Sequence, residues 1–69
     1  MIDLFVIQIT PGCYWVNTEH NKAITTNVQA LATRKPNSEA HVIRNHMVGL
    51  GYKRAVVVPA VEEEHERPN

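Results

Sequence analysis

The sequence predicts a small α+β domain, in which a mainly antiparallel sheet of three or four strands carries one helix on one face. Residues 2–10 and 55–58 form apolar runs rich in β-branched side chains, which are typical of strands. Residues 40–50 instead repeat apolar side chains every three or four positions, as one face of a helix does. The expected element order is β-β-β-α-β, within a single domain of residues 1–61.

The predicted helix begins just after Pro36, because proline is tolerated ahead of a first turn but not inside a helix. Asn37 or Ser38 can cap that turn by accepting hydrogen bonds from free backbone amides. The apolar face consists of Ala40, Ile43, Met47 and Leu50. Gly51 is expected to end the helix in the left-handed conformation, with Tyr52 folding back onto Met47.

The first two strands are expected at residues 2–10 and 13–17. Between them lies Thr10-Pro11-Gly12, in which proline fixes the first corner of a turn and glycine supplies a positive φ. We therefore expect an antiparallel hairpin. The polar residues 18–22 that follow are interpreted as the next turn.

Residues 23–33 alternate apolar and polar side chains, which predicts a third strand with a polar outer face. The competing interpretation is a short helix through residues 28–32, because alanine, leucine and glutamine favour helices. Residues 34–37 are expected to be a loop into the long helix. The last strand then joins the sheet, either beside the first strand or at the other edge.

Both faces of the first strand are apolar: Leu4 and Val6 point one way, and Phe5, Ile7 and Ile9 point the other. One helix covers only one face of such a sheet, so we expect an apolar patch on the second face. A patch of that kind on a soluble protein usually marks an interface, and self-association is the simplest case. The predicted partner-binding residues are Phe5, Ile7, Ile9, Tyr14 and Trp15.

Composition limits the other possibilities. The chain has 69 residues, one cysteine, seven basic and seven acidic residues, so it offers no internal disulfide and no net charge to attract nucleic acid or lipid. No apolar run is long enough to cross a bilayer, and the first residues do not resemble a signal peptide. A cytoplasmic protein is expected. Residues 62–69 are mostly charged, and we expect them to form a disordered acidic tail.

No pattern commits the chain to catalysis, a cofactor or a metal. His20, His41, His46 and His65 lack the spacing of metal ligands. Cys13 has no base nearby in sequence and no helix start to activate it. We therefore expect a protein that is not an enzyme.

The alternative hypothesis is a small nucleic-acid-binding domain that uses basic residues around the helix. Those residues are Arg34, Lys35, Arg44, Lys53 and Arg54. Tyr14 and Trp15 could stack on bases, but neighbours on a strand point to opposite faces, and the neutral charge argues against this function.

In size and element order the chain resembles small proteins encoded by phages and other mobile elements, which often bind and block a host enzyme. The likeness implies a small regulator or inhibitor with a protein partner. The leading hypothesis is therefore a non-enzymatic protein-binding module, expected to be a homodimer and to contact a host protein, that acts through an exposed apolar sheet face or edge.

Overall fold

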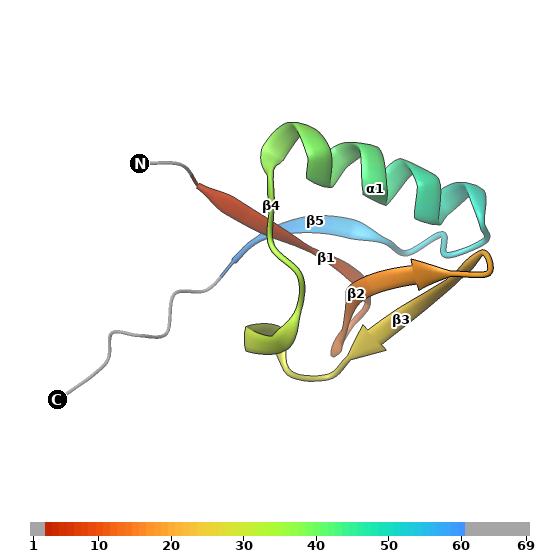
Figure 1. The fold of residues 1–69 in the computed structure, drawn as a ribbon, viewed down its shortest axis with the longest axis horizontal. Coiled ribbons are helices and arrows are strands. Elements are labelled where there is room, and N and C mark those ends of the chain that lie inside the picture. Colours follow the sequence, from red (N-terminus) through yellow and green to blue (C-terminus); the bar gives the residue numbers. More distant parts are fainter. Residues whose placement is uncertain (1–2, 61–69) are drawn as a thin grey trace, which may run out of the picture.

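A computed structural model describes residues 3–60 of the chain. Residues 1–2 and the predicted acidic tail at residues 62–69 lie outside this part, as does Val61. The described elements run in the order β1 (Leu4–Thr10), β2 (Cys13–Glu19), β3 (Lys22–Thr26), a 3₁₀ turn η1 (Gln29–Leu31), β4 (Lys35–Pro36), α1 (Asn37–Gly49) and β5 (Val56–Pro59). The predicted α+β class, with one helix on an antiparallel sheet, is confirmed (Figure 1).

Strand β1 is the centre of the sheet, and all its pairings are antiparallel. It pairs with β5 along Phe5 to Gln8, with β4 at Leu4 and Phe5, and with β2 at Gln8 and Thr10. A strand has only two edges, so two of the three partners of β1 must share one. Strand β5 pairs along one edge of β1, and β4 and β2 pair one after the other along the opposite edge. Strand β3 then pairs with β2 and forms the far edge. Of the two positions expected for the last strand, the one beside β1 is confirmed.

Helix α1 lies across one side of this sheet and ends as predicted (Figure 1). Gly51 has φ +108°, its N–H donates to the Val48 carbonyl, and the Tyr52 N–H donates to the Met47 carbonyl, each at 3.0 Å. These two bonds form a Schellman motif, which satisfies carbonyls that the helix leaves free. The predicted start was partly wrong, since the N-cap position is Pro36 and no side chain caps the first turn.

The turns between the first three strands differ from one another. At residues 11–12 the predicted hairpin is confirmed, with Gly12 at φ +84°. The predicted polar turn at residues 18–22 is shorter than expected, because β2 continues to Glu19 and β3 begins at Lys22. Only His20 and Asn21 connect them, at φ +53° and +62°, which is the two-residue turn that suits the twist of a hairpin. Polar side chains did not reveal these strand ends because the hairpin tip is exposed on both faces.

The third predicted strand, residues 23–33, is half right. Strand β3 ends at Thr26, and the 3₁₀ turn η1 occupies residues 29–31, within the range of the competing helical interpretation. The chain turns here because Thr33 returns to β2: its N–H donates to the Trp15 carbonyl at 3.3 Å and its hydroxyl to the Val16 carbonyl at 2.6 Å. The expected loop at residues 34–37 also contains the two-residue strand β4.

The expectation that Phe5, Ile7 and Ile9 face away from the helix is wrong. Ile7 and Ile9 belong to the core under α1, and Phe5 packs against that core. The rest of the buried cluster is Trp15, Ala40, Met47 and Ala55, so the predicted helix face is confirmed at Ala40 and Met47. Helix α1, about 20 Å long at 13 residues, spans most of the strand on the side that carries these three large apolar residues.

Candidate interaction surfaces

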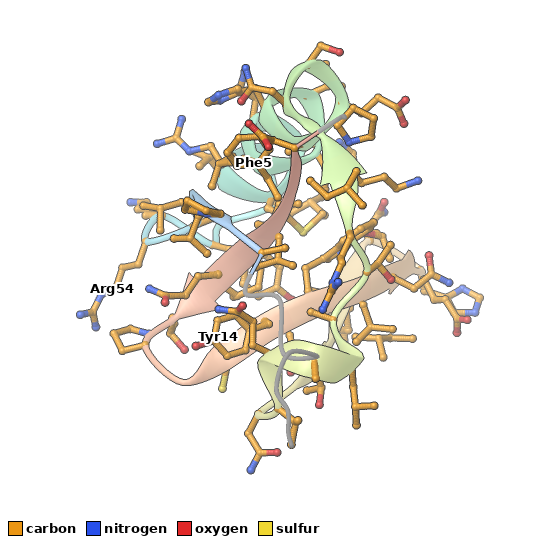
Figure 2. The ribbon with its side chains drawn as sticks, turned by 90° about the vertical axis from the view of Figure 1, so that its left-hand side faces the viewer. Phe5, Tyr14 and Arg54 are labelled. Carbon is orange, nitrogen blue, oxygen red and sulfur yellow. The ribbon has the colours of Figure 1, made fainter. Side chains whose placement is uncertain are left out.

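Four of the five predicted partner-binding residues belong to the core of the single chain. Ile7, Ile9 and Trp15 are 0, 4 and 7% exposed, and Phe5 is partly buried against them. A partner therefore cannot reach the first three without unfolding the domain. Tyr14 is the exception, because it lies on the side of the sheet away from α1, whereas Phe5 lies beside the helix (Figure 2).

Trp15 is buried because its polar group has a partner within the fold. The indole Nε1 donates to the Thr18 hydroxyl at 2.8 Å. Residues three apart on a regular strand point to opposite faces, but the register with β3 shifts by one between Trp15 and Asn17. This bulge brings Trp15 and Thr18 to the same face and satisfies the indole. Stacking of Trp15 on a base, which the nucleic-acid hypothesis used, is excluded by its burial.

The face of the sheet opposite α1, here called the uncovered face, can be read from the strand register. Residues directly opposite one another share a face, so Leu4, Gln8, Tyr14, Val56 and Val58 lie together. Leu4 is 39% and Val56 is 40% exposed, although Val6 on the same face is fully buried. The turn η1, which carries Leu31 at 67% exposed, lies on this side as well (Figure 1).

Sequence reasoning missed Leu4, Val56 and Leu31 as exposed apolar residues. The alternation in residues 4–10 did separate Leu4 from Phe5, Ile7 and Ile9, but alternation cannot say which of two apolar faces a helix covers. A sheet face with exposed apolar residues does exist, but most of its residues differ from those predicted. Of the five predicted partner-binding residues, only Tyr14 lies on the uncovered face.

The five basic residues of the nucleic-acid hypothesis lie at separate places. Lys35 and Arg34 precede α1, and the Lys35 ammonium is 3.9 Å from the Glu39 carboxylate. Lys53 and Arg54 follow the helix at its other end, and Arg54 points away from the sheet (Figure 2). Since α1 is about 20 Å long, these two pairs do not form one patch.

Arg44, the remaining basic residue, is partly buried and bonded to the end of the loop before β5. Its Nε donates to the Ala55 carbonyl at 2.9 Å, and its Nη1 donates to the Asn45 side-chain oxygen at 3.1 Å. The guanidinium group thereby ties the middle of α1 to the start of β5. A groove of about 230 Å³ opens at this place, here called the edge groove, and it is lined by His41, Arg44, Val56 and Val57.

The outer edge of β5 carries few free backbone groups. The Ala60 N–H donates to the Leu4 carbonyl at 3.0 Å, so Leu4 and Ala60 form a hydrogen-bonded pair. Because such pairs alternate along an antiparallel ladder, Val58 and Val56 bond to β1, while Val57 and Pro59 direct their backbone groups outward. Pro59 has no N–H, and the Ala55 carbonyl is bound by Arg44. Val57 is thus the one residue of β5 with both backbone groups directed outward.

The opposite edge of the sheet is protected in a similar way. In the hairpin of β2 and β3, Glu19 and Lys22 flank a two-residue turn and so form a hydrogen-bonded pair. The next residue, Ala23, directs its N–H outward, and this group donates to the Tyr52 hydroxyl at 3.1 Å. The side chains of Arg44 and Tyr52 thus each bind one backbone group at an edge of the sheet.

Among residues 3–60, no three histidine, cysteine or acidic side chains lie together as a metal site would need. Cys13 is a free, partly buried thiol at the start of β2. None of the described helices has the length and apolar character required to span a membrane. No family model, curated protein or solved structure matches the chain.

Proposed function

We propose that this protein is a non-enzymatic protein-binding module, and that its uncovered face joins two copies of the chain. The observation that carries the proposal is the exposure of Leu4 and Val56, with the partly buried Tyr14 and Val58 on the same side of the sheet, which α1 leaves open. Removing such side chains from water favours association by about 25 cal/mol per Å² of apolar surface.

A second copy is the partner that this face fits by symmetry. Two identical sheets stacked about a two-fold axis place the same apolar residues opposite one another. No acidic or basic residue stands among the five that define the uncovered face, so stacking would not bring like charges together. Leu31 on η1 would add apolar surface at the margin of the contact.

The size of the face sets the expected strength. A strand of seven residues is about 23 Å long, and three strands side by side span about 14 Å, so the face offers at most roughly 320 Å² of flat area per copy. Part of this area is already covered within the chain, because Val6 is fully buried. A stable interface buries about 800 Å² per partner. We therefore expect a weak dimer, with a dissociation constant on the order of 10 to 100 μM.

Sedimentation velocity from about 10 μM to about 500 μM tests the proposal. The sedimentation coefficient of the natural chain should rise across this range. Leu4→Lys places a charge on the uncovered face and should keep the chain monomeric, and Leu31→Lys should weaken the association. Val42→Lys is the matched control, because Val42 is 68% exposed on α1, outside this face.

A natural chain that stays monomeric at the highest concentration would contradict the proposal. So would a Leu4→Lys variant that is folded by circular dichroism and associates as strongly as the Val42→Lys control.

A further inference from the structure

We infer that the edge groove between α1 and β5 binds an extended peptide segment with an acidic residue at its centre and apolar residues on either side. This inference rests on the proposed protein-binding function, but its partner differs from that of the stacked dimer, and its site is the outer edge of β5, which shares Val56 and Val58 with the uncovered face. Adding a strand to a sheet edge is a common way for a domain to bind a peptide, since main-chain bonds give affinity and side-chain pockets give specificity.

The first argument is the backbone of Val57. Its N–H and C=O both point away from β1, so one residue of an antiparallel peptide can exchange two hydrogen bonds with it. On either side the edge is restricted, because Pro59 offers only a carbonyl and the Ala55 carbonyl is bound by Arg44. The site therefore accepts a short segment and does not support open-ended growth of the sheet.

The second argument is the direction of the incoming side chains. Val57 pairs with Ile7 and packs against the core under α1, so it faces the helix. A peptide residue opposite Val57 points to the same face, which places its side chain in the edge groove beside His41 and Arg44. Its two neighbours point to the other face, beside Val56 and Val58, where apolar side chains fit.

The third argument is charge. The two titratable groups that line the groove are His41 and Arg44, and neither is acidic. Residues 40–60 contain Arg44, Lys53 and Arg54 but no aspartate or glutamate. Two of the Arg44 nitrogens are bonded within the fold, and Nη2 has no hydrogen bond to the other residues of the described part of the chain, so it can meet a carboxylate. An aspartate or glutamate at the central position would gain a charge-assisted hydrogen bond there.

The same geometry disfavours a second copy of this chain at the groove. Pairing two β5 strands about a two-fold axis at Val57 would place both α1 helices on the same side of the joined sheet. The Arg44 groups of the two copies would then approach each other, with no carboxylate between them. The size of the edge groove points to a small occupant as well. Its volume of about 230 Å³ is below that of a site for a drug-sized molecule, so the groove suits a single side chain.

The test is a titration of the isotope-labelled full chain followed by NMR, with the capped peptide Thr-Val-Glu-Val-Thr as the probe. Addition of the peptide to about 5 mM at low salt should shift the amide signal of Val57 and the Nε–H signal of Arg44, with a dissociation constant on the order of 1 mM. The peptide Thr-Val-Gln-Val-Thr should bind at least about threefold more weakly, since it lacks the charge.

Three variants separate the parts of the site. Arg44→Gln should remove the preference for the glutamate peptide, whereas Arg54→Gln should keep it, because Arg54 does not line the groove. Val57→Pro deletes the outward N–H and should abolish binding while the signals of β1 and α1 stay in place. The comparison of Arg44→Gln with Arg54→Gln stands even if the proline variant does not fold.

Equal binding of the two peptides, shifts confined to the uncovered face around Tyr14, or no shifts at about 5 mM peptide would each overturn the inference. Its failure is distinct from that of the dimer. A chain that is monomeric in sedimentation yet prefers the glutamate peptide would support peptide binding at the edge groove and contradict the stacked dimer. A chain that forms a dimer but prefers neither peptide would support the dimer and contradict peptide binding.

Discussion

Trp15 shows how a large amphipathic side chain is buried in a small domain. The bulge in β2 turns Thr18 toward the indole, and the 2.8 Å bond between them replaces the water that Nε1 would otherwise bind. A buried indole without this partner would cost about 1–3 kcal/mol. The run of Tyr14, Trp15 and Val16 after the turn places Trp15 on a strand, but a bulge of one residue has no signature in this sequence, so the partner could not be predicted.

The two glycines at the end of α1 have different roles. Gly51 sits at φ +108°, where side chains are rarely tolerated, whereas Gly49 is the last helical residue and does not have a positive φ. Nothing lies within 4 Å of a Cβ built at either position, so only the backbone decides the effect of a substitution.

We therefore expect Gly51→Ala to lower the free energy of unfolding by about 1 kcal/mol and Gly49→Ala to raise it by about 0.5 kcal/mol. Urea denaturation of both variants measures the difference. The role given to Gly51 would be wrong if the two substitutions had the same sign.

Among the elements, β5 depends on which of its residues bond to β1. Val58 belongs to a hydrogen-bonded pair with Val6, and Val57 does not bond to β1. Proline lacks an N–H and is accepted at strand positions that face outward.

Val57→Pro should therefore be tolerated, with a loss of less than about 1 kcal/mol, while Val58→Pro should cost about 1–3 kcal/mol more because it leaves the buried Val6 carbonyl unpaired. Thermal denaturation followed by circular dichroism compares the two. Equal losses, or a larger loss for Val57→Pro, would show that the register of β5 is shifted by one residue.

Prediction from the sequence succeeded for elements whose signals are local. The face of α1 at Ala40 and Met47, the stop at Gly51 and the turn at Gly12 follow from spacing and backbone preference. Strand β4 could not be predicted, because two residues such as Lys35 and Pro36 have no periodicity. The side of β1 that α1 covers could not be predicted either, because both sides of the strand are apolar.

For the whole molecule, the proposed association has a thermodynamic consequence. A partner that binds only the folded chain stabilises it in proportion to the logarithm of concentration. For a domain of this size, about 1 kcal/mol shifts the melting temperature by roughly 4–8 °C.

The melting temperature of the natural chain should rise by a few degrees for each tenfold increase in protein concentration above the dissociation constant. The Leu4→Lys variant should show no such dependence, whereas Val42→Lys should retain it. Calorimetry at a fixed scan rate measures this, and a melting temperature independent of concentration in the natural chain would argue against self-association.

The position of β1 in the sheet bears on how the protein is made. Its partners β2 and β5 come from opposite ends of the described chain, and β5 ends only at Pro59. During synthesis at about 5–20 residues per second, β1 leaves the ribosome roughly 2–10 seconds before β5 does. For most of that interval, until α1 has been made, Ile7 and Ile9 have no helix above them, and their apolar side chains remain exposed in the nascent chain.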